Sequence, residues 1–295
     1  MPSPESRIRQ RERGKPIFPI AALAAKSNET ADQAVLRVDA LQASEQKRRW
    51  GMTWVAAADY RRAKDERQRA HPCQDYGMVQ HLDDTIMIGA VASGDDTASL
   101  SHVGARLAVR TSIDYLRQSP EQANDATADS TGDRARDLYR GMMDAIRERL
   151  REDAVDRVAP IREFSASLSV FVAKPTGVAA MRIGDGLIVS RGHHGDYSLL
   201  FSDDSESTPA SITDRDTADR LVIRVQGGPI DFLCAASDPL DRLSTRGQDG
   251  TPQKKFFRPL DEYTSIAPDD IEVHRGIRNF LRRCAPTCGV TPDRL

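Results

Sequence analysis

The chain has 295 residues, of which 39% are hydrophobic and 29% are charged, proportions that are typical of a soluble globular protein. Its 42 basic and 44 acidic residues give a net charge of -2. The chain therefore has no overall positive charge that would attract nucleic acid or an acidic membrane. Four cysteines are too sparse for a disulfide framework, and the longest apolar runs are much shorter than the roughly 20 residues that cross a bilayer. We therefore expect a cytoplasmic protein without a membrane span, whose partners do not include nucleic acid.

The first 49 residues differ in pattern from the rest of the chain. Residues 1–16 are polar and rich in arginine, which predicts a mobile arm that buries too little apolar surface to order itself. Residues 29–49 carry apolar side chains at spacings of three and four, which predicts an amphipathic helix. The arm could instead bind nucleic acid or an acidic partner, and the helix could dock on another protein. We favour a solvated tail and a helix outside the core. The core domain is then expected to span residues 50–295.

From residue 50 onward, the hydrophobic pattern predicts strands, then two helices, then more strands and a last helix. Strands are predicted at 53–58, 76–79, 85–92, 165–173, 177–183, 187–191, 198–201, 221–225 and 231–236. Helices are predicted at 104–116, 134–150 and 271–284, with a loop at 119–133. Glycines at 184 and 186 predict a tight hairpin turn. Because strands and helices come in blocks, this order favours an α+β fold over a regularly alternating, doubly wound one.

Four short motifs, each at the end of a predicted strand, are the candidates for chemistry. They are His-Pro-Cys-Gln-Asp at 71–75, Ala-Ser-Gly-Asp-Asp at 92–96, Ile-Gly-Asp-Gly at 183–186 and Ser-Asp-Pro at 237–239. Carboxylates at strand ends can converge on one pocket, where their oxygens suit hard divalent cations. Taken singly, each motif is explained as well by a turn or a solvated cap. Their order as a set is what favours a functional site.

That order resembles the metal-dependent protein phosphatases of the PPM family (type 2C), in particular the bacterial branch. Further matches are Trp54 on the first strand, Gly-Ala-Arg at 104–106 opening a helix, and a Phe-Phe segment at 255–260. The resemblance implies a sandwich of two antiparallel β-sheets flanked by helices. It also implies hydrolysis of phosphoserine or phosphothreonine by water activated between two Mg²⁺ or Mn²⁺ ions. The implied partners are a phosphoprotein and a serine/threonine kinase.

The resemblance can be carried over position by position to candidate metal ligands. Asp75 matches the first ligand, and Asp238 matches the aspartate of the Ser-Asp-Gly motif. Gly94 matches the glycine whose backbone carbonyl binds metal. Asp293 stands where the family has a final acidic pair. No residue is implied as a catalytic group apart from these metal ligands.

The departures from the family pattern bear on activity. Ser93 stands where the family has the aspartate that bridges the two ions, and a neutral hydroxyl is a poor ligand for a hard dication. Pro239 replaces the glycine after Asp238, which removes a backbone donor and fixes φ. The chain stops at Leu295, where the resemblance implies a last core strand, so we expect that this strand either is missing or was cut away.

Two hypotheses follow from these departures. Asp95 or Asp96 could take over the bridging role, because both lie within three residues of Ser93. In that case the chain is an active phosphatase. Otherwise the two aspartates are turn residues beside a decayed site, and the chain is a pseudophosphatase that binds a kinase or a phosphoprotein without hydrolysis.

Overall fold

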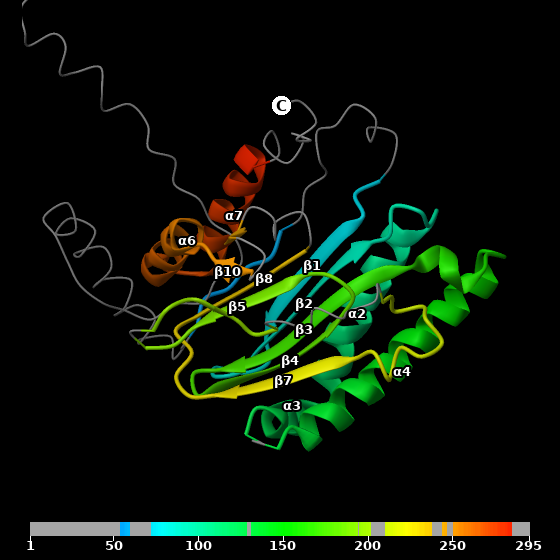
Figure 1. Cartoon of the computed structure of the whole chain (residues 1–295), viewed down its shortest axis with the longest axis horizontal. Helices are drawn as coiled ribbons and strands as arrows, with labels where there is room; N and C mark the ends of the chain where they lie inside the picture. The colour runs from blue at the N-terminus through cyan, green and yellow to red at the C-terminus, as the bar shows by residue number, and fades with distance from the viewer. Residues whose placement is uncertain are drawn as a thin grey trace, which may run out of the picture.

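Two antiparallel β-sheets, stacked face to face between two layers of helices, make up the fold in the computed structural model (Figure 1). The structure describes residues 54–59, 72–128, 131–193, 195–201, 210–237, 244–246 and 250–284. The predicted arm and the predicted helix at 29–49 lie outside these residues. Among the residues described, no helix combines the length and the apolar character that a membrane span requires.

The larger sheet has five strands in the order β1-β2-β3-β4-β7, and the smaller sheet has three in the order β6-β5-β8. The larger sheet contains β1 (Asp75–His81), β2 (Met87–Gly94), β3 (Ala166–Lys174), β4 (Gly177–Ile183) and β7 (Val222–Gly227). The smaller sheet contains β5 (Leu187–Arg191), β6 (Ser198–Leu199) and β8 (Phe232–Ala236). A separate short pair is formed by β9 (Thr245–Arg246) and β10 (Thr251–Pro252).

The helices cover the outer face of each sheet. They are α2 (Ser101–Gln118), α3 (Pro120–Ala126), α4 (Asp133–Asp156), the 3₁₀ helix η3 (Ile161–Phe164), α6 (Lys254–Ile266) and α7 (Asp270–Cys284). Helices α2 and α4 bury their apolar stripes against the larger sheet. Helices α6 and α7 lie on the opposite side of the molecule, where Phe257 and Phe280 pack on the smaller sheet (Figure 1).

Strand periodicity explains the layers. Side chains alternate between the two faces of a strand, so even and odd positions of β2 and β3 enter different cores. Ile88 and Val170 pack with the helices, whereas Met87 and Phe171 pack against the smaller sheet. Because both faces of the larger sheet are buried, its central strands read as continuous apolar runs. The predicted α+β sandwich of two antiparallel sheets is confirmed.

The predicted hairpin across residues 184–186 is wrong. Strand β4 pairs with β3 and β7, whereas β5 pairs with β6 and β8, so this turn carries the chain from one sheet to the other. Gly184 and Gly186 have φ values of +70° and +124°, in the left-handed region that glycine tolerates. A Cβ on Gly184 would lie 2.4 Å from the carbonyl oxygen of Ala210. The glycines therefore serve a tight crossing between sheets.

Three other local predictions also need correction. Residues 54–57 are buried, but no strand forms in the described part of the segment predicted at 53–58, and the amide of Ala56 donates to Asp270 Oδ1 at 2.8 Å instead. The predicted loop at 119–133 contains α3, which begins at a proline and buries Ala123 and Ala126. Helix α6 was missed, because Pro259 lies inside it.

Helix α4 ends in a left-handed cap that a valine occupies. The amide of Val158 donates to the Val155 carbonyl at 3.1 Å, and that of Ala159 donates to the Ala154 carbonyl at 2.9 Å, which is the Schellman pattern. Val158 has a φ of +52° and is 93% exposed, so its side chain gains little from packing. We expect Val158→Gly to relieve this strain and to raise the free energy of unfolding by about 0.5–1 kcal/mol, measured by denaturant titration.

Val155→Gly provides a matched control for this prediction. Val155 is also exposed, but it lies within α4, where glycine is a poorer helix former than valine. This variant should lower stability by a few tenths of a kcal/mol. If Val158→Gly destabilised the protein as Val155→Gly does, the cap would not be strained.

Candidate functional site

A row of three polar side chains crosses one end of the larger sheet. The antiparallel register places Asp75 of β1 opposite Ser93 of β2, and Ser93 opposite Ser167 of β3. Directly paired residues project from the same face, which here is the face toward the smaller sheet. The Ser167 hydroxyl donates to the Ser93 carbonyl at 3.4 Å, and Oδ1 of Asp75 is buried. The row therefore supplies one carboxylate and two hydroxyls.

The end of β2 is fixed against the start of α2. The Gly94 amide donates to the Gln74 carbonyl at 3.1 Å, and Gln74 Nε2 donates to Ser101 Oγ at 3.2 Å. A Cβ on Gly94 would lie 2.7 Å from the Cβ of Ser101, so only glycine fits without displacing the helix. These contacts join the first two motifs and set the position of the Gly94 carbonyl.

Asp95 is a turn-forming residue that connects this turn to Ser165, the residue before β3. Its Oδ1 accepts hydrogen bonds from the Thr97 amide at 2.8 Å and the Thr97 hydroxyl at 2.7 Å, and its Oδ2 accepts one from Ser165 Oγ at 3.3 Å. The Thr97 hydroxyl and amide lower the pKa of Asp95. Asp96 beside it is exposed. Both oxygens of Asp95 are thus engaged in local structure, which favours the turn interpretation over a bridging role.

The third motif and the end of β8 reach the same end of the two sheets. Leu187, directly after the Gly-Asp-Gly turn, lies opposite Ala236, the last residue of β8. A Cβ on Gly186 would lie 3.1 Å from Ser169 Oγ and 3.3 Å from the Ala236 carbonyl oxygen. Asp238 follows two residues after β8 in the sequence. Asp238 and Asp293 lie outside the residues that the structure describes, and their proposed ligand roles stay predictions.

The donors present at this end can be compared with what divalent cations require. Within the described ranges, no group of three or more His, Cys, Asp or Glu side chains could hold a metal ion. The available donors are the Asp75 carboxylate and the Gly94 carbonyl, with Ser93 between them contributing only a hydroxyl. Mg²⁺ commonly keeps several waters and binds through one or two carboxylates. These donors could therefore provide some of the ligands of a single ion. They do not include the second carboxylate that a pair of ions would share.

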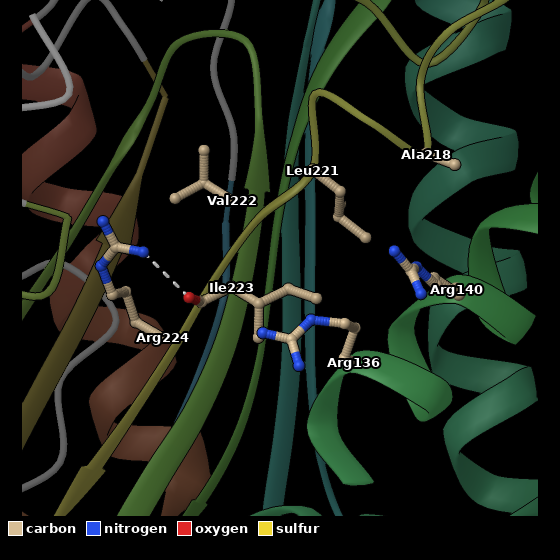
Figure 2. A pocket seen from close by; sticks show the side chains of 7 residues that line it. All are labelled: Arg136, Arg140, Ala218, Leu221, Val222, Ile223 and Arg224. Carbon is tan, nitrogen blue, oxygen red and sulfur yellow. Dashed lines mark hydrogen bonds between the residues drawn. The ribbon is translucent and has the colours of Figure 1, made fainter. Parts of the chain in front are cut away.

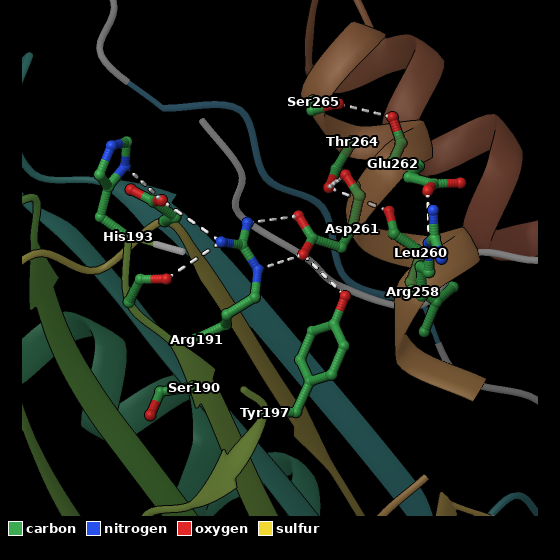
Figure 3. A network of polar contacts seen from close by, with 12 residues as sticks. Ser190, Arg191, His193, Tyr197, Arg258, Leu260, Asp261, Glu262, Thr264 and Ser265 are labelled. Atoms are coloured by element: carbon green, nitrogen blue, oxygen red, sulfur yellow. Dashed lines mark hydrogen bonds and ion pairs between the residues drawn. The ribbon is translucent and has the colours of Figure 1, made fainter. Parts of the chain in front are cut away.

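A buried ion-pair network that the sequence did not reveal joins α6 to the smaller sheet (Figure 3). Arg191 of β5 donates to both oxygens of Asp261 at 2.5 and 3.0 Å, and the Tyr197 hydroxyl donates to the same carboxylate at 2.8 Å. Arg191 also donates to the carboxylate of Asp231 at 3.3 Å and to the Gly192 carbonyl at 3.0 Å. Burial raises the pKa of Asp261, and the Arg191 guanidinium opposes that shift. We assign this network a structural role, since it holds α6 in place.

Comparison with known proteins identifies the family. The model of the protein phosphatase 2C family matches residues 62–282. Serine/threonine-protein phosphatase 3 of Escherichia coli strain K12 is 28% identical over 195 residues, which cover 64% of this chain and 74% of that protein. The Mycobacterium tuberculosis serine/threonine phosphatase PstP has a TM-score of 0.48 and 14% identity, over 77% of this chain and 91% of that one. The PstP catalytic domain in complex with two manganese ions has a TM-score of 0.43 and 15% identity, over 73% and 88%. Because the family match spans most of the chain, this protein belongs to the protein phosphatase 2C family, the PPM-type serine/threonine phosphatases that its motifs predicted.

Proposed function

We propose that this chain hydrolyses phosphoserine and phosphothreonine in a protein substrate, slowly, through a metal centre reduced to one divalent cation. The row Asp75–Ser93–Ser167 is the observation that supports this proposal. It supplies one carboxylate, from Asp75, and a hydroxyl at position 93, where a two-ion centre needs a carboxylate that binds both ions. The ligands would be Asp75, the Gly94 carbonyl, and Asp238 and Asp293, the last two being assigned from motif order alone. Mg²⁺ or Mn²⁺ suits these oxygen donors.

Each residue at the strand end has a definable part in this chemistry. A bound divalent cation would supply a water of lowered pKa and would neutralise charge on the phosphoryl oxygens. Asp75 supplies negative charge from a partly buried position, and the packing of Gly94 on Ser101 holds its carbonyl in place. Ser93 cannot supply a second anionic ligand. We therefore expect slower hydrolysis than a centre with the shared carboxylate would give.

A second candidate is a pseudophosphatase that binds a phosphoprotein or a serine/threonine kinase without hydrolysing phosphate. Two observations favour it: Ser93 occupies the bridging position, and the carboxylate of Asp95 is engaged with Thr97 and Ser165. Both candidates would bind a phosphoprotein in the cytoplasm, and the second could bind a kinase instead. The name of the Escherichia coli relative, a serine/threonine-protein phosphatase, supports this class of partner.

Titration of Mn²⁺ into metal-free protein, followed by calorimetry, tests the proposal. Wild-type protein should bind one ion per chain, and Asp75→Asn should weaken that binding at least tenfold, or about 1.4 kcal/mol, because a charged ligand is lost. Asp96→Asn is the matched control, since it removes an exposed carboxylate from the neighbouring turn and should leave the affinity unchanged.

Two outcomes would change the assignment. Absence of any binding heat at millimolar Mn²⁺ would reject the hydrolase and leave the pseudophosphatase. A loss of affinity in Asp96→Asn equal to that in Asp75→Asn would make Asp96 a substitute ligand and would restore the case for a more complete centre.

A further inference from the structure

A pocket lined with arginines lies at an edge of the larger sheet, between β7 and α4 (Figure 2). Its volume is about 320 Å³. The lining residues are Arg136, Arg140, Ala218, Leu221, Val222, Ile223 and Arg224. Figure 2 shows Arg136 and Arg140 on the α4 side of the strand and Arg224 on its other side. Guanidinium groups thus flank the strand on both sides; we call this surface the arginine edge.

Strand β7 is an edge strand of the sheet. Within the described part of the chain its one strand neighbour is β4, so its other side carries no ladder of hydrogen bonds. Such an edge offers backbone N–H and C=O groups to an added strand. The Ile223 carbonyl accepts a hydrogen bond from Arg224 Nη1 at 3.1 Å, so the guanidinium of Arg224 lies close to the backbone of β7.

The charge of the arginine edge selects an anionic ligand. Among the residues that the structure describes, its lining holds three guanidinium groups and no carboxylate. Arg136 pairs with Asp133 at 2.7 Å, but both side chains are exposed, and such pairs exchange readily with solvent or ligand. No ion pair joins Arg140 to a carboxylate among the residues described. Arginine binds carboxylate and phosphate oxygens in a two-pronged geometry, so acidic side chains suit this surface well.

The arginine edge lies at the same end of the sheet as Ser93. Gly94 pairs with Ala166 at the start of β3, and Arg182 at the end of β4 pairs with Val222 at the start of β7. From β2 to β7 there are three strand steps of about 4.8 Å, or about 14 Å across the sheet. Arg224 is level with Gly89 of β2, four residues from Ser93, which adds about 13 Å along the strands. An extended peptide covers the resulting distance of about 19 Å in about six residues. One protein segment can therefore reach both places.

We propose that the arginine edge docks an extended, acidic segment of the phosphoprotein partner, which adds as a strand to β7 and places its acidic side chains on Arg136, Arg140 and Arg224. The acidic residues would lie about six or more positions from the phosphorylated residue, given the separation above. The choice of a phosphoprotein as partner rests on the proposed function. The docking chemistry itself depends only on the edge strand and the arginines.

Binding of a defined peptide tests this inference. The probe is a fluorescent peptide of about twelve residues that begins with phosphothreonine and carries alternating glutamate and valine from about the sixth position after it. The comparison peptide carries glutamine in place of glutamate. Fluorescence anisotropy in EDTA measures binding alone. Wild-type protein should bind the glutamate peptide at least tenfold more tightly than the glutamine peptide. Arg140→Gln/Arg224→Gln should remove this difference, whereas Arg151→Gln, an exposed arginine elsewhere on α4, should retain it.

Further measurements separate the possible failures. Methylation of alternate backbone nitrogens of the peptide should weaken binding at least tenfold, and equal binding would overturn strand addition. Equal affinity of the double variant and wild type would overturn docking at the arginine edge. Displacement of the peptide by an equimolar DNA strand of about ten nucleotides would overturn the choice of a protein segment as the ligand. Peptide binding is measured without metal, so a negative result would reject docking at the arginine edge and would not bear on the one-ion phosphatase. A negative Mn²⁺ titration would reject the one-ion phosphatase and would not bear on docking.

Discussion

Ser93→Asp should convert the centre from one bound Mn²⁺ to two and should raise hydrolysis of p-nitrophenyl phosphate at least tenfold. The register puts the new carboxylate directly opposite Asp75, on the face toward the smaller sheet. A carboxylate there can be shared between two ions, and two ions stabilise both the attacking and the leaving oxygen. Without metal, two like charges opposite each other destabilise a strand pair. The variant should therefore melt below wild type in EDTA and gain more stability from Mn²⁺.

Ser93→Asn is the matched control, because it has nearly the same size as aspartate and no charge. It should bind Mn²⁺ like wild type and show no gain in hydrolysis. If Ser93→Asp and Ser93→Asn behaved alike in calorimetry and in the phosphate assay, residue 93 would not be what limits the centre. The cause would then lie with Pro239 or with the C-terminal acidic position.

Local patterns were sufficient to predict most elements of this fold. The bounds of β4 and β5 agree with the prediction to the residue, because both are apolar runs bounded by glycines. Pairing was harder to predict. A Gly-Asp-Gly turn is compatible with a hairpin and with a crossing between sheets, and the difference depends on contacts such as that of Gly184 with Ala210, 26 positions later in the sequence. Helix α6 was not predicted, because a proline such as Pro259 usually interrupts a helix, although the amphipathic pattern of this segment is pronounced.

The candidate site was likewise predictable from the sequence only in part. The order of the motifs predicted that the first two would meet, and the register of β1 and β2 brings Asp75 to Ser93. The sequence did not predict that Asp95 is bound by Thr97 and Ser165, since the second contact spans 70 positions. Polar contacts between residues far apart in the sequence do not affect the hydrophobic periodicity from which the elements were predicted. The arginine edge and the Arg191–Asp261 pair were missed for the same reason.

Asp261→Ala should lower the free energy of unfolding by about 3 kcal/mol, measured by denaturant titration. Arg191 and Asp261 have side chains that are only 15% and 9% exposed, and removing one partner of a buried pair leaves an uncompensated charge. The hydroxyl of Tyr197 loses its acceptor as well. Asp231 remains 3.3 Å from Arg191, which keeps the loss at the lower end of the range of about 3–5 kcal/mol.

Two further variants show whether the pair itself holds α6 in place. Glu262→Gln changes the neighbouring, exposed carboxylate of the same helix and should cost less than about 0.5 kcal/mol. Arg191→Met/Asp261→Leu removes both charges and fills similar volume, so it should lose less stability than Asp261→Ala alone. A double variant as unstable as Asp261→Ala would mean that packing, not the unpaired Arg191, accounts for the loss. A cost below 1 kcal/mol for Asp261→Ala would mean that Asp231 compensates and that α6 is held mainly by Phe257 and Leu260.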